Sequence, residues 1–294
     1  MSLSSRVTKL YASDDFIDSF YLEREFYIDE LHENFHLDPG SLIQIVSENN
    51  EKKSALLYVT ADMVKLCNSE KKVALGEFAP RDKNQLWYFN LLNEEDFKIV
   101  VSLGTAGTGK TSIAIAKAVD LYFKQRRTIY LTKPTHMVQD HENQVFGPVP
   151  GDVEEKYAPY LGSFEIVLKK VLGSEGSSYL DSMKKKKHLQ YIPVEYTRGC
   201  TFEDCTFIID EVQNMTWHEL KTVMSRIGEN SKLILCGDPY QIDSNMSLEQ
   251  TGIYNLLTSD TFLASDITTS VTLTKQYRGV IPDLIYHIDK EMKG

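Results

Sequence analysis

The chain has 294 residues, of which 42% are hydrophobic and 25% are charged, a composition typical of a soluble globular protein. Its net charge of −10 argues against binding nucleic acid by bulk positive charge. There is no apolar run long enough to cross a membrane and no basic-then-apolar leader pattern, so we expect no membrane segment and a cytoplasmic location. The four cysteines form no Cys-x-x-Cys pair, which favours reduced thiols over metal ligation.

The first 80 residues carry no motif with recognisable chemistry. Residues 1–9 are predicted to be a tail, and the acidic, aromatic stretch 13–35 has apolar residues at helical spacing, which predicts an amphipathic helix or a helix pair. Strand-like runs between residues 41 and 78 predict a small β-rich module. With 8 basic and 14 acidic residues the region is acidic, so residues 10–35 are a candidate docking segment for a protein partner.

The rest of the chain alternates between strand-like and helical patterns, which predicts an α/β fold with a mostly parallel sheet and helices on both faces. Strands are expected at 97–103, 127–132, 190–195, 205–210, 231–236 and 268–274. Helices are expected at 110–124, 152–172, 216–227 and 280–292. The segment GSEGSS (173–178) and the run Lys184–Lys187 are predicted to form a hairpin or an insertion.

Residues 97–112 (FKIVVSLGTAGTGKTS) combine an apolar strand, a glycine-rich turn and the start of a helix. The turn fits the phosphate-binding pattern G-x-x-x-x-G-K-[ST], in which backbone N–H groups surround a phosphate at a helix N-terminus. Lys110 is expected to reach the terminal phosphates, and the Thr111 hydroxyl to bind Mg²⁺. The nucleotide-binding residues predicted here are Gly104, Thr105, Ala106, Gly107, Thr108, Gly109, Lys110, Thr111 and Ser112.

The strand expected at 205–210 ends in Asp210, and Glu211 follows it directly. Because ligands in open α/β sheets lie at the carboxyl ends of strands, Asp210 is predicted to hold Mg²⁺ and Glu211 to polarise the attacking water. The next strand ends in GDPYQ, where Gln241 is suited to sensing the γ-phosphate or the water. A Gly-Asp-Pro turn followed by a glutamine on the surface is an equally good interpretation of these five residues.

Two further side chains are candidates for contacts with the nucleotide. Gln85 lies before the first strand of the core, and its amide can pair with both edges of adenine. Arg278 follows the last strand and could stabilise charge on the γ-phosphate, from the same subunit or from a neighbouring one. Arg198 and Arg226 are weaker candidates for that role, and the histidines show no metal-ligand spacing.

Several segments together resemble the PhoH-like ATPases, a family related to superfamily-1 helicases. They are PRDKNQLWYF, GTAGTGKT, Lys133-Pro134, VPGDVEEKYAPYL, YTRGCTF, FIIDEVQN, SRIGENSKLILCGDPYQID and TLTKQYRG, which cover roughly residues 84–294 in order. The resemblance implies a RecA-like core, hydrolysis of ATP with Mg²⁺, and in several members a hexameric ring that acts on RNA. Longer members carry an N-terminal PIN ribonuclease domain, for which this chain has no room, and Lys133 stands where the family usually has arginine.

We therefore predict a small helical and β-rich module at residues 1–80 and a PhoH-like P-loop ATPase domain at residues 81–294. The predicted function is ATP hydrolysis with Mg²⁺, coupled to movement on or remodelling of single-stranded nucleic acid, with RNA favoured over DNA. The alternative is a ring-forming regulatory ATPase that acts on a protein partner through residues 10–35. A small-molecule kinase is disfavoured because Glu211 and Gln241 suit water activation, and a GTPase because no [NT]-K-x-D signature occurs.

Overall fold

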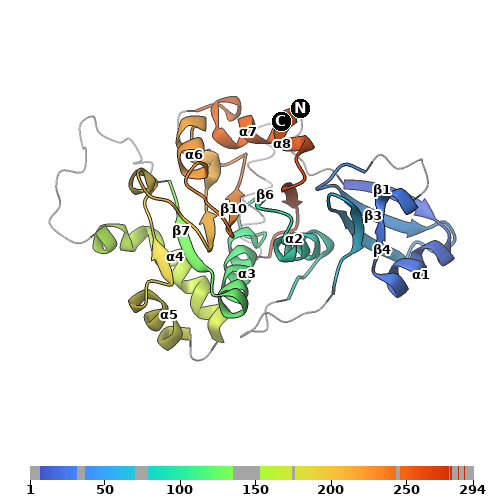
Figure 1. Cartoon of the computed structure of the whole chain (residues 1–294), viewed down its shortest axis with the longest axis horizontal. Coiled ribbons are helices and arrows are strands. Elements are labelled where there is room, and N and C mark those ends of the chain that lie inside the picture. The colour runs from blue at the N-terminus through green and yellow to red at the C-terminus, as the bar shows by residue number, and fades with distance from the viewer. Residues whose placement is uncertain are drawn as a thin grey trace. The chain divides into compact units, whose positions relative to one another are not determined.

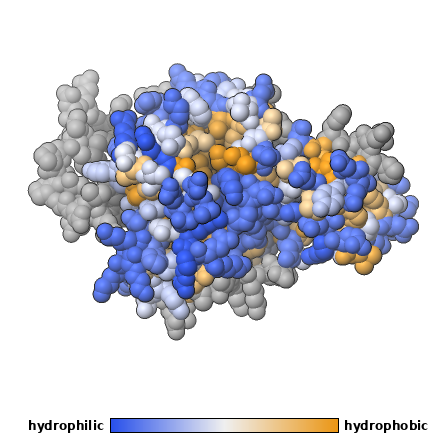
Figure 2. Space-filling view, viewed as in Figure 1, coloured by the Kyte–Doolittle hydropathy of each residue, from blue (hydrophilic) through white to orange (hydrophobic). Residues whose placement is uncertain are grey.

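The computed structural model describes residues 7–31, 37–69, 79–134, 153–173, 176–242, 246–277, 279, 284 and 288 (Figure 1). The chain divides into two compact units. The first comprises Met1–Lys71, Ala79–Ile113 and Leu257–Gly294, and the second comprises Lys72–Phe78 and Ala114–Leu256. Hydrophilic residues dominate the described surface seen in Figure 2. In the described part of the chain, no helix has the length and apolar character needed to cross a bilayer.

A five-stranded sheet occupies the start of the first unit, in the order β1-β3-β4-β5-β2. Its strands are β1 (Val7–Ala12), β2 (Glu25–Tyr27), β3 (Leu42–Ser47), β4 (Ser54–Val59) and β5 (Met63–Leu66). β1 runs parallel to β3, and the other neighbours are antiparallel. The β-rich module is thus confirmed, whereas the predicted tail is wrong from Val7 onward, because those residues pair along the whole length of β3.

One helix, α1 (Asp14–Glu23), connects β1 to β2. The Ser13 hydroxyl caps its start by accepting a hydrogen bond from the Phe16 N–H (3.3 Å), and Arg24 ends it in a left-handed conformation (φ 72°). The chain then enters β2 and a 3₁₀ turn (Ile28–Glu30), so the predicted stretch contains a helix and a strand instead of a helix pair. Residues 32–36 of that stretch lie outside the described residues.

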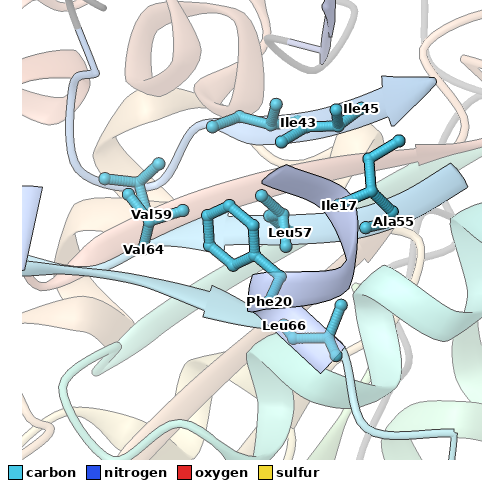
Figure 3. Packing of buried hydrophobic residues seen from close by; sticks show 9 residues of the cluster. All are labelled: Ile17, Phe20, Ile43, Ile45, Ala55, Leu57, Val59, Val64 and Leu66. Atoms are coloured by element: carbon cyan, nitrogen blue, oxygen red, sulfur yellow. The ribbon is translucent and has the colours of Figure 1, made fainter. Parts of the chain in front are cut away.

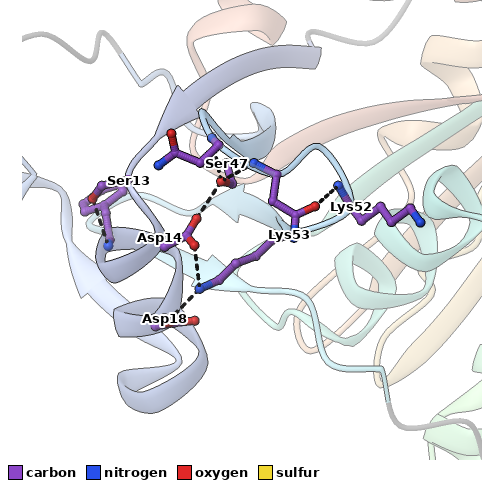
Figure 4. A network of polar contacts seen from close by, with 9 residues as sticks. Ser13, Asp14, Asp18, Ser47, Lys52 and Lys53 are labelled. Carbon is purple, nitrogen blue, oxygen red and sulfur yellow. Dashed lines mark hydrogen bonds and ion pairs between the residues drawn. The ribbon is translucent and has the colours of Figure 1, made fainter.

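The core of this module lies between α1 and the sheet (Figure 3). Ile17 and Phe20, one helical turn apart, are both completely buried against side chains from the strands, chiefly Ile43, Ile45, Ala55, Leu57, Val59, Val64 and Leu66. Polar contacts join the exposed start of α1 to the β3–β4 turn (Figure 4). The Ser47 hydroxyl donates to Asp14 (2.5 Å), and the Lys53 ammonium lies 2.8 Å from the Asp18 carboxylate. The Lys53–Asp18 ion pair is partly exposed, and exposed ion pairs contribute little to folding stability. Burial of the apolar side chains therefore supplies most of the stability of this module.

The remaining helices and strands of the first unit belong to the predicted nucleotide-binding domain. They are α2 (Lys83–Asn93), β6 (Ile99–Gly104), α8 (Asp260–Ala264) and β11 (Thr268–Leu273). β6 and β11 are parallel partners in the register Ile99↔Thr268. The Trp87 indole of α2 is fully buried and donates to the Leu57 carbonyl of β4 (2.9 Å), so α2 is fixed to the N-terminal sheet.

The second unit alternates strands and helices. α3 (Lys110–Gln125) begins in the first unit and leads into β7 (Thr128–Thr132), α4 (Val153–Leu172), α5 (Gly176–Lys185), β8 (Leu189–Tyr191), β9 (Cys205–Ile209), α6 (Trp217–Met224), β10 (Lys232–Gly237) and α7 (Gly252–Leu257). β10, β9, β7 and β8 are parallel neighbours in that order. β6 and β11 in the first unit and these four strands in the second are all parallel pairs, which confirms the predicted α/β class.

Two local predictions in this unit are wrong. Of the hairpin or insertion predicted for 173–178 and 184–187, the hairpin is wrong, because the segment contains helix α5, in which Leu180 and Met183, one helical turn apart, are both buried. β8 is also shorter than predicted, since it ends at Tyr191 before Pro193, which cannot donate a hydrogen bond to a neighbouring strand. The predicted helix at 280–292 lies almost entirely outside the described residues.

An ion-pair cluster is buried within α3. The Lys117 ammonium lies 2.7 Å from the Asp120 carboxylate, and the more exposed Lys124 lies 2.9 Å from the same group. Burial opposes ionisation of Asp120, but the hydrogen bonds and charges of the two lysines outweigh it and lower the pKa of this carboxyl. The cluster therefore stays charged in the folded protein at neutral pH.

Candidate functional site

The phosphate-loop sequence adopts the strand, turn and helix that its pattern predicts. β6 ends at Gly104 and α3 begins at Lys110. Gly104 (φ 149°), Gly107 (φ 82°) and Gly109 (φ 98°) all have backbone conformations that L side chains rarely adopt. A Cβ atom at Gly104 would also lie 2.3 Å from the Leu273 carbonyl oxygen of β11. Only glycine fits there, so the close approach of β11 helps to shape the loop.

The ammonium group of Lys110 binds carbonyl groups of the loop itself. Its Nζ donates to the carbonyl oxygens of Gly104 (2.5 Å) and Thr105 (3.0 Å). The Thr108 hydroxyl, which also donates to Thr105 O (2.9 Å), closes the same turn. Phosphate oxygens are charged acceptors and compete well with neutral carbonyls, so the lysine is already placed to exchange one set of acceptors for the other.

Gln85 braces the loop from α2. The Asp82 carboxylate caps this helix by accepting from the Gln85 N–H (2.9 Å). The Gln85 amide is buried, with Oε1 accepting from the Arg81 N–H (2.9 Å) and Nε2 donating to the Thr108 carbonyl (2.8 Å). A Cβ at Gly109 would lie 2.9 Å from Nε2, a second reason for glycine at that position. Both ends of the amide are thus bound to protein, and its pairing with adenine stays a prediction.

Two residues after β11 contact the loop and were not predicted as site residues. Gln276 Nε2 donates to the Thr105 hydroxyl (3.1 Å), and the Tyr277 N–H donates to the Gly107 carbonyl (3.0 Å). The Tyr277 hydroxyl donates to Asp82 (2.6 Å), and burial together with this bond raises its pKa to about 12. The Arg81 guanidinium lies 5.2 Å from the centre of the same ring. Their only sequence signal was proximity to Arg278, which lies outside the described residues.

In the second unit, Asp210 and Glu211 follow the fully buried strand β9. The Asp210 N–H donates to the Thr132 carbonyl of β7 (3.0 Å), and little of Asp210 is exposed. Glu211 has a left-handed backbone (φ 55°, ψ 39°), which is uncommon for a residue with a Cβ atom. A 3₁₀ turn, Val212–Asn214, follows directly, and the Asn214 N–H donates to the Glu211 carbonyl (3.0 Å). This geometry fixes the direction in which the Cα–Cβ bond of Glu211 leaves the chain.

The Glu211 carboxylate has a contact on each of its oxygens. Gln213 Nε2 donates to Oε2 (2.8 Å), and the Lys133 ammonium lies 3.6 Å from Oε1. Lys133 follows β7, so the cation comes from the strand beside β9. The family resemblance had left the effect of lysine at this position open, and in this chain its ammonium pairs with the candidate general base.

Gln213 joins three parts of this region and was also missed as a site residue. Its side chain is completely buried. Besides the bond to Glu211, Nε2 donates to the Gln241 carbonyl (2.8 Å) and Oε1 accepts from the Asp238 N–H (3.0 Å). A Cβ at Gly237 would lie 3.1 Å from Gln213 Oε1, so a glycine makes room for the amide. Its position two residues after Glu211 was the available signal.

The turn after β10 also has hydrogen bonds within itself. The Asp238 carboxylate accepts from the Tyr240 N–H (3.0 Å), and the Gln241 N–H donates to the Asp238 carbonyl (3.0 Å). The Gln241 side chain is exposed, so its part in sensing phosphate or water stays a prediction. Among the described residues, no group of three or more His, Cys, Asp or Glu side chains could hold a metal ion by itself. The oxygen atoms of Thr111 and Asp210 are nonetheless of the kind that Mg²⁺ prefers when phosphates supply further ligands.

The remaining candidates are less informative. Arg198 is exposed and Arg226 half-buried, and neither forms an ion pair among the described residues. In the run Lys184–Lys187, Lys184 pairs with Glu165 of α4 and the other three side chains are exposed, as a solvated surface would be. His136 and His141 lie outside the described residues.

Comparison with known proteins identifies the family. The sequence profile of the PhoH-like proteins matches residues 77–277, more than half of the chain. The chain belongs to the PhoH family. It is 29% identical to protein PhoH2 of Bacillus subtilis over 240 residues, which cover 80% of this chain and 53% of that protein. It is 37% identical to protein PhoH of Escherichia coli K12 over 164 residues, or 55% of this chain and 44% of that protein.

Two further comparisons set the extent of the similarity. A PhoH-like protein of B. subtilis is 38% identical over 146 residues, 49% of this chain and 44% of that protein. The chain thus spans about half the length of the relatives it matches. Among solved structures, the Pif1 helicase of Candida albicans aligns with a TM-score of 0.35 and 16% identity, over 68% of this chain and 41% of that chain. The family and the phosphate loop together make this member of the PhoH family a P-loop NTPase.

Proposed function

We propose that the protein hydrolyses ATP with Mg²⁺ and couples hydrolysis to binding, translocation on or unwinding of single-stranded nucleic acid, with RNA favoured over DNA. The observation that carries the hydrolysis step is the fixed acid Glu211. It follows a buried strand in a left-handed conformation, and Gln213 ties it to the turn after β10. A protein that only binds nucleotide does not need an acid held in this way. A protein that hydrolyses the nucleotide does, because the acid must accept a proton from the attacking water.

The phosphate loop would hold the nucleotide. Residues Gly104–Ser112 would surround the phosphates, with Lys110 exchanging the carbonyls of its own loop for phosphate oxygens. Gln85 and Tyr277 would receive the adenine, the first through its amide and the second through its ring. The Gln85 side chain already contacts the loop at Thr108 and the Tyr277 backbone N–H contacts it at Gly107, so base and phosphate contacts would form together.

Catalysis would use the acids and their neighbours. Thr111 and Asp210 would hold Mg²⁺, which when bound neutralises charge on the phosphates. Glu211 would accept a proton from the attacking water, and Gln241 would orient that water or sense the γ-phosphate. Arg278 would stabilise the charge that develops on the γ-phosphate, from the same subunit or from a neighbour.

The wider assignments rest on the family. Residues 1–80 are proposed as an accessory module and residues 81–294 as the ATPase domain, and the active protein is proposed to be a homo-oligomer in the form of a hexameric ring. Mass photometry with and without ATP tests the assembly, since a ring would appear as a discrete species at six times the 33.6 kDa chain mass.

The decisive experiment is steady-state ATP hydrolysis with and without single-stranded RNA or DNA. Glu211→Gln should bind a fluorescent ATP analogue like the wild type and yet lose turnover, because it removes only the proton acceptor. Lys110→Ala should weaken binding of the analogue itself. Stimulation by RNA supports the proposal, and a rate indifferent to every polymer contradicts its nucleic-acid part. Normal turnover by Glu211→Gln would show that the base is misassigned.

A second candidate, an ATPase that acts on a protein partner through residues 10–35, is favoured by one observation. Tyr21, Leu22 and Tyr27 are 51%, 78% and 57% exposed on an otherwise acidic segment. Deleting the segment would also remove strands and a helix of the N-terminal sheet, so a surface substitution is the better test. Leu22→Asp should abolish co-purification of the partner and leave ATP turnover unchanged. Loss of RNA stimulation in the same variant would count against this second function.

A further inference from the structure

The two side chains that contact the Glu211 carboxylate differ in how firmly they are held in place. Gln213 is completely buried, and its Nε2, which donates to Oε2 of Glu211, also donates to the Gln241 carbonyl, while its Oε1 accepts from the Asp238 N–H. Lys133, which faces Oε1 at 3.6 Å, ends in a flexible side chain that is 33% exposed. Among the described residues, Glu211 is its ion-pair partner. One oxygen of the carboxylate is therefore fixed by the fold, and the other is covered by a removable cation.

The backbone of Lys133 is held even though its side chain is free to move. Thr132, the residue before it, is the last of β7 and is the register partner of Ile209 in β9. The Thr132 carbonyl accepts from the Asp210 N–H (3.0 Å), and Pro134 favours an extended backbone at Lys133. The ammonium group can therefore turn away from Glu211 while the strand and the acid stay in place.

This arrangement has a chemical consequence for hydrolysis. A general base must turn a free lone pair toward the attacking water. An ammonium group facing Oε1 competes with that water for the same oxygen, whereas the bond from Gln213 leaves Oε1 free. Partly exposed ion pairs are weak, so another anion can compete with Glu211 for the Lys133 ammonium, and breaking the ion pair requires little free energy. The phosphate groups of a nucleic-acid backbone are such anions, and both members of the pair are accessible to them.

We propose that Lys133 is a positioning residue that covers Glu211 in the resting protein, and that a backbone phosphate of single-stranded nucleic acid draws Lys133 away and frees Glu211 for water activation. This inference rests on the proposed ATPase function and adds its regulation. Nucleic acid would then stimulate hydrolysis by breaking one ion pair, that between Lys133 and Glu211. Gln213 keeps Oε2 fixed throughout, so the freed carboxylate keeps its direction.

The test compares Lys133→Gln, Lys133→Arg and the matched surface control Lys221→Gln in the full chain. Lys221 is an exposed lysine of α6 in the same unit. Lys133→Gln should raise kcat without nucleic acid about two- to five-fold, the range that an exposed ion pair can supply. The KM for ATP should stay unchanged, and added single-stranded RNA should no longer raise the rate. Lys133→Arg should keep both the low basal rate and the stimulation, and Lys221→Gln should match the wild type.

The outcomes separate this inference from the function on which it rests. If the wild type is active and is stimulated by RNA, a basal kcat for Lys133→Gln equal to or below the basal kcat of the wild type overturns the inference alone. A raised basal kcat with normal stimulation by RNA overturns the release step, because the nucleic acid then acts elsewhere. If neither the wild type nor Lys133→Gln hydrolyses ATP, the proposed function fails and the inference fails with it.

Discussion

Replacing Gln213 by leucine is the sharpest test of how the second unit holds its catalytic acid. The two side chains have similar volumes, so the change removes three hydrogen bonds and leaves no large cavity. Glu211 and Gln241 would lose the interaction that ties them to each other. We expect kcat to fall at least about tenfold with little change in the KM for ATP, because a base that is free to rotate faces water only part of the time.

The cost to stability follows from which partners can reach water. The Gln241 residue is exposed, so its carbonyl can bind water instead, and the one-third-exposed Glu211 carboxylate can do the same. Asp238 is buried, so its N–H would lose its acceptor at a cost of about 1–3 kcal/mol. Adding about 1 kcal/mol for the lost bond to the carboxylate gives a destabilisation of about 2–4 kcal/mol. This should lower the thermal midpoint by about 4–10 °C.

The assay is steady-state ATP turnover beside a thermal melt, with Gln190→Leu as the control. Gln190 lies on the edge strand β8, where its amide donates to the Lys187 carbonyl (2.9 Å), and it has no contact with the acids in the described structure. The control should keep turnover and lose less stability. Wild-type turnover by Gln213→Leu would refute the idea that this glutamine positions Glu211. A loss of turnover with an unchanged midpoint would refute the energetic part of the reasoning.

Three further predictions concern the rest of the chain. Asp120→Asn should cost about 3–5 kcal/mol at pH 7 in urea unfolding, because it leaves Lys117 charged and buried. The pKa of Asp120 is lowered in the folded state, so its contribution to the free energy of unfolding is present above the ordinary carboxyl pKa of about 4 and disappears as the pH falls through the folded value. A difference in unfolding free energy between variant and wild type that widens in acid would contradict this. In native protein a thiol reagent should label Cys200 alone, since the others are buried and burial raises the pKa of Cys205 to about 11; rapid labelling of a second cysteine would disprove that packing. Phe20→Ala should cost about 3–5 kcal/mol and expose the amides of the N-terminal sheet to hydrogen exchange, and unchanged protection there would show that Phe20 is not central to its core.

The sequence was most informative where a local pattern and the chemistry coincide. The order strand, glycine turn, helix around Gly104–Thr111 predicted the loop, because positive φ angles need glycine and the helix start needs a good helix former. The parallel strands were predicted from buried apolar runs such as Cys205–Ile209. In both cases the deciding information lies within a few neighbouring residues.

Other features depend on contacts between distant parts of the chain, and these could not be predicted. Tyr277 and Gln276 reach a loop about 170 residues earlier, and nothing in their neighbouring residues indicates it. Gln213 becomes important because Gly237 of the next strand leaves room for its amide. No residue of Val7–Ala12 is fully buried, so the strand character of this segment comes from pairing with β3 and not from an apolar run.

That first strand decides how the protein can be shortened. β1 covers one side of β3, whose residues are nearly all buried. A truncation that begins at α1 would turn β3 into an open edge, with unpaired backbone groups and apolar side chains ready to pair with another chain. A shortened protein of that kind would precipitate or form mixed-strand oligomers even with its phosphate loop intact. An insoluble truncation would therefore reflect a missing strand and would carry no information about the catalytic unit.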